Sequence, residues 1–270
     1  MAPALRPWLL ASLTVISARG TEAFVAQPAV VRTCSSQGLA SATAFSADVT
    51  TTSTQKVLDF AIVGGGPAGL AAAVGLKEKG LNVKVFEAAP EFSERGSAVF
   101  LQSFGLAELD KIQPGLAAEA VAAGREVEVL HLTRPSGETI AKVDMTFVTK
   151  VVGYPFIGIA RHALQKVLLR HLEDDDIELG ARLEGLETHQ GEGITELRFR
   201  GQSEVVRARA VIGADGRRSM VRKKVLAAEE RNCDWALTWW ALADIPEPAT
   251  PKGEFRMSYS TKQAIYYGEV

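Results

Sequence analysis

A glycine-rich loop directly after the first apolar run of the chain has the spacing that binds nucleotide phosphates. Residues 59 to 80 read DFAIVGGGPAGLAAAVGLKEKG, which sets a G-x-G-x-x-G pattern at Gly64, Gly66 and Gly69. In such a loop the first glycine permits a tight turn, the second lets a pyrophosphate approach the backbone, and the third allows a helix to pack closely on the sheet. Pro67 and Ala68 begin the expected helix, whose free N–H groups and positive dipole end favour phosphate.

An acidic residue ends the next expected strand, at the distance where a ribose-binding carboxylate is found. The stretch LNVKVFE alternates apolar and polar residues and ends at Glu87. Together with the apolar run and the helix, it completes a βαβ unit over residues 57–87. A carboxylate at Glu87 accepts hydrogen bonds from a ribose hydroxyl and repels a 2′-phosphate. We therefore expect the bound dinucleotide to be FAD or NAD and not NADP.

A second glycine-containing turn follows another expected strand, in ARAVIGADGRRSMVRKKV. Its residues Gly213, Asp215 and Gly216 resemble the GADG..S.VR motif of the class A flavoprotein monooxygenases. That family includes salicylate and para-hydroxybenzoate hydroxylases, ubiquinone-pathway hydroxylases and zeaxanthin epoxidase. An ordinary Asp-Gly turn before a basic helix fits the same letters, and the upstream dinucleotide fingerprint is what favours the family.

Two further stretches resemble the family. IGIARHALQKVLLRHL is similar to its helix that begins near an arginine, here Arg161, whose guanidinium lies by the flavin. RGSAVFLQSFGLAEL is similar to the loop and helix after the ribose carboxylate, although Gln102 and Ser103 replace the usual Pro-Asn pair. The resemblance covers residues 57 to about 245.

The resemblance implies an enzyme in which FAD carries the difficult chemistry and the fold positions it. NADPH or NADH is the transient reductant and has no Rossmann domain of its own. One oxygen atom of O2 then passes to an aromatic or isoprenoid small molecule. Asp215 and Arg161 are expected near the flavin, Arg217 and Arg218 are either solvated or attract a nucleotide phosphate, and the catalytic residues stay unknown.

The expected fold class is α/β, with a Rossmann-like FAD/NAD(P)-binding domain, an inserted β-hairpin and the start of a β-sheet substrate domain. We place the FAD-binding domain at 56–232, with the hairpin at 125–147 belonging to the substrate side, and incomplete substrate-domain strands at 233–270. The late Gly-Asp-Ala-Ala-His motif of the family is not found after residue 216, which predicts a chain truncated at its C-terminus.

Three functional hypotheses remain open at this point. The first is an NAD(P)H-dependent monooxygenase that hydroxylates or epoxidises its substrate. The second is a catalytically incomplete FAD-binding remnant or fragment, and the third is a flavoenzyme of the geranylgeranyl reductase type. The residues that would select the substrate lie mostly in the part of the family pattern that is missing here.

Composition argues against other classes of partner. The formal net charge of −2 gives no reason to expect nucleic acid. The two cysteines lie far apart and the histidines are scattered, so we expect neither a disulfide framework nor a metal site. The sequence also gives no support for a peripheral membrane contact, which leaves a small-molecule substrate as the expected partner.

The first 55 residues are predicted to be a disordered targeting presequence. Arg6 precedes an apolar stretch from Trp8 to Ile16 that is too short to span a bilayer, and a Ser/Thr-rich segment follows at 41–55. The junction TEAFVAQP resembles the cleavage site of bipartite presequences in algae with secondary plastids, where a transit peptide begins with Phe, here Phe24. We expect a plastid location, the alternative being a plain secretory signal and a secreted or endomembrane protein.

Overall fold

The computed structural model describes residues 57–94, 98–189, 191–226, 250–259 and 264–267. The chain divides into two units, Met1–Thr52 and Ser53–Val270, and every described residue belongs to the second unit. The predicted presequence lies outside the described residues, and so does the first part of the predicted substrate-domain strands, up to residue 249.

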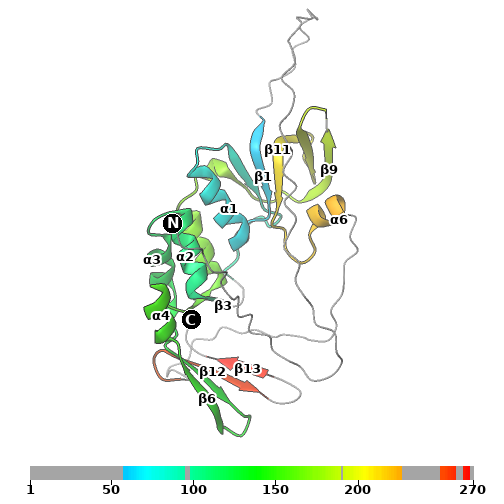
Figure 1. Ribbon diagram of the computed structural model, residues 1–270. Helices are drawn as coiled ribbons and strands as arrows, with labels where there is room; N and C mark the ends of the chain where they lie inside the picture. The colour runs from blue at the N-terminus through cyan, green and yellow to red at the C-terminus, as the bar shows by residue number, and fades with distance from the viewer. Residues whose placement is uncertain (1–56, 95–97, 190, 227–249, 260–263, 268–270) are drawn as a thin grey trace, which may run out of the picture. The chain divides into compact units, whose positions relative to one another are not determined.

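A six-stranded sheet forms the centre of the nucleotide-binding part and has the order β8-β2-β1-β11-β10-β9. Its strands are β1 (Leu58–Val63), β2 (Val83–Phe86), β8 (Ile177–Glu178), β9 (Leu183–His189), β10 (Ile194–Phe199) and β11 (Val206–Gly213). The first four strands in this order run parallel, and β10 runs antiparallel to both of its neighbours, β11 and β9 (Figure 1). The parallel strands therefore place their carboxyl ends on one edge, where ligands bind in open α/β sheets.

Helix α1 (Pro67–Lys77) packs on one face of this sheet. Helices α2 (Ser103–Ile112), α3 (Leu116–Ala123) and α5 (Arg161–Leu169) pack with α1 and share its hydrophobic core. Ile62 of β1 is buried in their core, whereas its neighbours Ala61 and Val63 are buried in a second core on the opposite face, which also contains Val221 of α6 (Met220–Leu226). Because both faces of β1 are covered, residues 60–63 form a continuous apolar run instead of an alternating pattern.

The stretch after Glu87 differs from the prediction of a loop that leads directly into a helix. Residues Ala98–Leu101 form β3, which pairs with β7 (Ile157–Ala160), and β7 in turn pairs with β4 (Arg125–Glu126). This short strand is defined by pairing with residues far along the chain, so its own sequence gives little signal. Strand β7 was not predicted either, nor were α3, α4 (Thr146–Val152) and the short 3₁₀ helix η1 (Asp174–Asp176).

The predicted hairpin forms within a second sheet of order β13-β12-β5-β6. Its strands are β5 (Val129–Thr133), β6 (Thr139–Asp144), β12 (Glu254–Tyr259) and β13 (Ala264–Tyr267). The hairpin is shorter than predicted, because Arg125 and Glu126 pair with β7. Strand β12 runs parallel to β5 and brings Phe255 onto Phe100, with ring centroids 4.5 Å apart.

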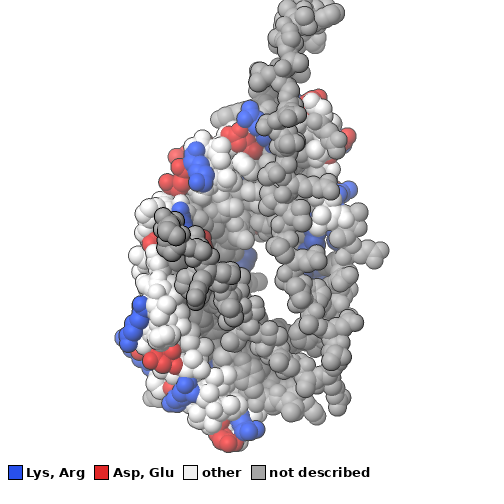
Figure 2. Space-filling view, in the orientation of Figure 1, with Lys and Arg blue, Asp and Glu red and all other residues white. Residues whose placement is uncertain are grey.

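The described surface mixes charges of both signs. Figure 2 shows acidic and basic side chains interspersed over the visible described residues, in agreement with exposed ion pairs such as Lys111 with Glu108 and Arg134 with Glu138. Such pairs add little to stability. Within the described part of the chain, no helix has the length and apolar character needed to cross a membrane.

Candidate functional site

The glycine loop lies at the carboxyl edge of the parallel strands. Gly64 donates its N–H to the carbonyl of Phe86 over 2.8 Å, and Ala214 donates to the carbonyl of Val63 over 2.8 Å. The loop is therefore tied to the ends of β2 and β11 at once. Gly64 has a φ of +109°, and a Cβ at this position would lie 2.4 Å from the Ala214 carbonyl oxygen. Only glycine fits this turn.

Close packing at Gly69 seats helix α1 directly on the loop. A Cβ at Gly69 would lie 2.0 Å from the carbonyl oxygen of Gly64 and 3.2 Å from the Cβ of Ala214. The absence of a side chain is thus what allows the first turn of α1 to approach β1 and β11, the packing that the G-x-G-x-x-G spacing predicts.

The N-terminus of α1 is open. Gly66 is its N-cap, no side chain caps it, Pro67 occupies the first turn, and no acidic residue lies in that turn. A helix start leaves backbone N–H groups without helical acceptors, and the helix dipole adds partial positive charge there. Among the described residues, and apart from the neighbours of Gly66 in the chain, a Cβ built at Gly66 would meet only Nη2 of Arg161, at 3.4 Å. This end of the helix can therefore accept an anion.

A cavity of about 640 Å³ opens in front of this helix end. Six of the residues proposed from sequence line it: Gly64, Gly66, Glu87, Arg161, Asp215 and Gly216. The other four, Pro67, Ala68, Gly69 and Gly213, do not line it. Gly213 instead lets α6 approach β11, because a Cβ there would lie 2.8 Å from Val221. The structure thus brings together residues from both motifs, although they are far apart in the sequence.

The carboxylate of Glu87 is held by backbone donors. Its Oε2 accepts from the N–H of Gly65 at 2.6 Å, and its Oε1 accepts from the N–H of Ala89 at 2.8 Å. A carboxylate has about four acceptor positions, so two remain for other donors. Glu87 is therefore fixed at the cavity wall with capacity left for ribose hydroxyl groups, and it also orders the glycine loop.

Charged groups at the cavity are incompletely paired. Arg161, at the start of α5, lines the cavity and has no ion pair with another described residue. Asp215 accepts from the N–H groups of Met220 and Val221 through Oδ2, at 2.6 and 3.2 Å, which caps α6. Its other oxygen, Oδ1, is buried without a hydrogen-bond partner. A buried acceptor of this kind calls for a donor from a ligand or water.

Several site residues were missed by the sequence analysis. Arg182, Glu184 and Arg200 line the cavity, and Nε of Arg200 lies 2.6 Å from Glu184. Gln165, on α5, donates to the carbonyl of Gly65 over 2.9 Å and is buried. These residues belong to no motif, and only pairing of distant strands and helices brings them to the loop. Among the described residues no group of His, Cys, Asp and Glu could hold a metal ion.

The FAD binding domain family matches residues 57–257, which include both glycine motifs. The chain belongs to this FAD-binding family. An aurachin C monooxygenase/isomerase of Stigmatella aurantiaca is 31% identical over 186 residues, which cover 69% of this chain and 47% of that protein. An FAD-dependent urate hydroxylase of Mycolicibacterium vanbaalenii is 31% identical, with 61% of this chain and 41% of that protein covered.

Solved structures agree on the fold. A variant of Klebsiella pneumoniae HpxO complexed with FAD superimposes with a TM-score of 0.62 and 18% identity, covering 77% of this chain and 53% of that one. P. aeruginosa PqsL in complex with 2-aminobenzoylacetate gives a TM-score of 0.60 and 23% identity, covering 75% and 54%. The predicted α/β fold and the resemblance to flavoprotein monooxygenases are confirmed. The chain spans about half the length of the curated relatives it matches.

The residues at the cavity suit the two chemical parts of the adenosine diphosphate half of FAD. The open helix N-terminus and Arg161 favour the diphosphate, and Glu87 keeps acceptor positions for the ribose. The unpartnered Oδ1 of Asp215 would repel a phosphate, so it fits a hydroxyl donor better. Space, charge and hydrogen-bonding capacity at the cavity therefore agree with the cofactor of the family.

Proposed function

We propose that this protein binds FAD in the cavity between the glycine loop and the Asp-Gly turn and acts as an NAD(P)H-dependent monooxygenase. The observation that carries the proposal is the convergence of Gly66, Glu87, Arg161 and Asp215 on one cavity of about 640 Å³. When bound, the flavin takes electrons from the reductant and activates O2 for transfer of one oxygen atom to the substrate. What this chain supplies is binding and orientation.

Different residues of the cavity bind different parts of the cofactor. The α1 N-terminus and Arg161 bind the diphosphate, Glu87 accepts from the adenosine ribose, and Asp215 accepts a hydroxyl group through Oδ1. Both carboxylates are held by the protein before ligand binding: Glu87 by backbone donors, and Asp215 by the start of α6. Such preorganisation reduces the entropy lost when the cofactor is bound.

NADH or NADPH is proposed as the transient reductant. In support, the exposed Arg218 lines the same cavity and forms no ion pair with another described residue, so its charge is free to attract a nucleotide phosphate. The proposed substrate is a small aromatic or isoprenoid molecule. Urate and para-nitrophenol are named for relatives of this chain, which supports an aromatic ring as the reacting group.

We also propose plastid targeting through residues 1–55, on the strength of the apolar Trp8–Ile16 stretch and the TEAFVAQP junction. The proposal depends on sequence pattern alone. The alternative is an endomembrane or secreted location. Locating the full chain in the cell distinguishes the two.

The decisive experiment for cofactor binding is a flavin titration of the purified chain and its Gly66→Val variant. A branched side chain at Gly66 would point at the cavity and occupy the path of the diphosphate. Gly191→Val is the control, because Gly191 is exposed between β9 and β10, outside the cavity, and a side chain there would meet no described neighbour within 4 Å. We expect FAD binding to be lost in the first variant only. Oxidation of NADH and NADPH, with and without phenolic substrates, then tests the reaction. Wild-type affinity in Gly66→Val would refute the site.

A further inference from the structure

The carbonyl group of Gly65 is held by a side chain that no nucleotide-binding motif contains. Nε2 of Gln165 donates to this carbonyl oxygen over 2.9 Å, and 100 residues of chain separate the two. Both residues are buried: Gln165 is 5% exposed. On the other side, the N–H of Gly65 donates to Glu87 over 2.6 Å. The backbone of Gly65 is therefore clamped between α5 and the end of β2.

The clamp has a consequence for the next residue. The carbonyl of Gly65 and the N–H of Gly66 belong to one planar peptide unit, and no described peptide bond is cis. In a trans unit these two groups point in opposite directions. Fixing the carbonyl toward Gln165 therefore fixes the Gly66 N–H away from it. Gly66 lines the cavity, and its N–H donates to no other described residue.

We propose that Gln165 is a positioning residue for the cofactor: it keeps the Gly65–Gly66 peptide from rotating and so holds the Gly66 N–H ready for a phosphate oxygen. The inference rests on the proposed binding of FAD in this cavity. Glycine residues have little resistance of their own to peptide rotation, since both sides of the unit lack a Cβ. A loop of three consecutive glycines needs such an external constraint more than most loops do.

The position of Gln165 on α5 supports this role. It lies four residues after Arg161, and residues at this spacing lie on the same face of a helix. One face of α5 thus presents a cation to the cavity at its first residue and an amide to the loop one turn later. Rotation or displacement of α5 would move both groups together.

The test compares Gln165→Met with the wild-type chain. Methionine keeps the length and volume of the side chain but donates no hydrogen bond, so the Gly65 carbonyl is left unpaired and the peptide can rotate. We expect FAD to bind about tenfold more weakly, a typical loss for one hydrogen bond in a preorganised site. Leu168→Ala is the matched control, because Leu168 is buried on the same helix and has no polar contact with the loop.

A comparison of ligands separates positioning from a general loss of structure. ADP and adenosine differ only in the diphosphate, and each can be titrated in competition with FAD. If Gln165 acts through the Gly66 N–H, Gln165→Met weakens the binding of ADP about as much as the binding of FAD. The affinity for adenosine then stays unchanged. If the binding of ADP and the binding of adenosine were weakened equally, the whole pocket would be distorted. That result would overturn the proposal. Wild-type affinity for FAD and ADP would do the same.

Gln165→Glu gives a second, independent measurement if the methionine variant does not fold. An ionised carboxylate facing the Gly65 carbonyl has no donor, whereas a protonated one donates through its O–H. The ratio of variant to wild-type dissociation constants should then fall as the pH is lowered from 8 to about 5.5, since burial raises the pKa of a carboxyl group. A ratio that does not change with pH contradicts the inference. A wild-type chain that binds no FAD would instead refute the proposed function itself.

Discussion

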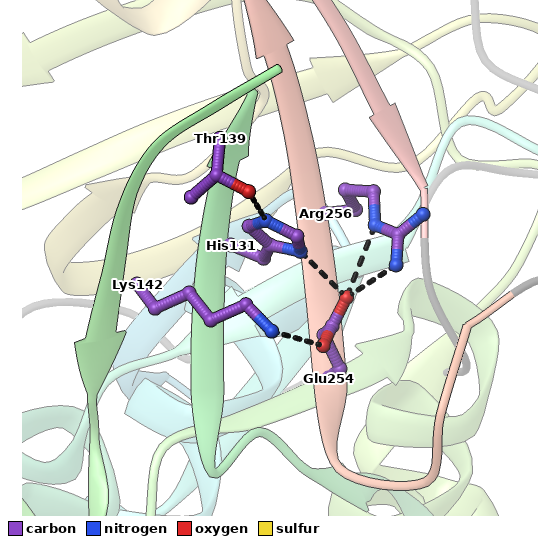
Figure 3. Close-up of polar contacts among 5 residues, drawn as sticks. All are labelled: His131, Thr139, Lys142, Glu254 and Arg256. Atoms are coloured by element: carbon purple, nitrogen blue, oxygen red, sulfur yellow. Dashed lines mark hydrogen bonds and ion pairs between the residues drawn. The ribbon is translucent and has the colours of Figure 1, made fainter. Parts of the chain in front are cut away.

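Nδ1 of His131 lies 2.9 Å from Oε1 of Glu254, and this contact joins the β-hairpin to a strand 123 residues further along the chain. Figure 3 shows the surrounding network, in which Glu254 also accepts from Arg256 and His131 contacts Thr139. Nζ of Lys142 lies 3.8 Å from the second carboxylate oxygen. Both His131 and Glu254 are about 9% exposed at their side chains. The network therefore ties β12, β5 and β6 together where water is largely excluded.

Replacing Glu254 by Gln should destabilise the protein most at neutral pH. Burial is the largest influence on the pKa of Glu254 and raises it, but the hydrogen bonds from His131 and Arg256 and the charges of both outweigh it. The pKa of Glu254 therefore lies below its ordinary value of 4.5. A folded-state pKa below the unfolded one means that ionised Glu254 stabilises the fold above about pH 4.5, and that this stabilisation is lost as the pH falls through the folded-state value.

The measurement is urea denaturation of the wild type and of Glu254→Gln between pH 3.5 and 7.5. We expect the free energy of unfolding to fall by about 1–3 kcal/mol at pH 7, because donors are left without a charged acceptor. The difference between the two proteins should be smaller at pH 3.5. Glu138→Gln is the control, since that carboxylate pairs with Arg134 at the exposed hairpin turn. A difference that stays constant over the whole pH range would show that the ionisation of Glu254 is not what stabilises the sheet.

Gly69→Ala should be strongly destabilising although alanine favours helices. The added Cβ would lie 2.0 Å from the Gly64 carbonyl oxygen, so α1 would have to move away from the loop. Overpacking of this kind costs about 1–3 kcal/mol. Gly105→Ala on α2 is the matched control, because beyond its own helix the nearest described atom to an added Cβ is Cδ2 of Leu101, 4.0 Å away. In thermal and urea unfolding, the free energy of unfolding of this control should rise by up to about 1 kcal/mol. If both variants changed the free energy of unfolding by the same amount, close packing at Gly69 would not be what requires glycine there.

The glycine loop was predictable because its signal is local. Gly64, Gly66, Gly69 and Glu87 lie within one βαβ unit, and each has a conformational or chemical requirement that its residue type expresses directly. The hydrogen bonds that Glu87 accepts from the N–H groups of Gly65 and Ala89 were not predicted. Its position at the end of β2 indicated a ribose contact but gave no sign that the same carboxylate also orders the loop.

The rest of the site depends on contacts between distant parts of the chain. Gln165 looks like any polar residue in a helix, and only the packing of α5 on the loop gives it a role. Strand β3 was predicted as a loop, because four residues carry little pattern until β7 pairs with them. The N-terminal 56 residues lie outside the described structure, so their targeting role stays a prediction.

Processing of the N-terminus is predicted to occur in two steps. The apolar Trp8–Ile16 stretch should direct entry into the secretory route with cleavage just before Phe24, and the Ser/Thr-rich segment should be removed after import into a plastid. The full chain, tagged at its C-terminus and expressed in an alga with a secondary plastid, can be purified and sequenced from its N-terminus. Phe24→Ala should still enter the secretory route but fail to reach the plastid. A mature form that begins at Met1 would contradict both signals.

Replacing Arg161 by Ala should weaken FAD binding and reduce its dependence on salt. The Arg161 guanidinium lines the cavity beside Gly66 and has no ion pair with another described residue, so its charge is available to a phosphate. Loss of a charge-assisted hydrogen bond costs about 1.5–3 kcal/mol, which corresponds to roughly a ten- to hundredfold higher dissociation constant. Arg161→Lys should retain part of the affinity, because it keeps the charge but not the forked geometry.

Titrations at low and high ionic strength complete this test. Salt screens the attraction between Arg161 and a diphosphate, so wild-type affinity should fall more steeply with salt than that of Arg161→Ala. Arg170→Ala is the matched control: it removes the same charge just after the other end of α5, where Arg170 lies 3.8 Å from Glu119 and outside the cavity. This control should keep both the affinity and the salt dependence of the wild type. If Arg161→Ala and Arg170→Ala proved indistinguishable, the cofactor diphosphate could not lie at the start of α5.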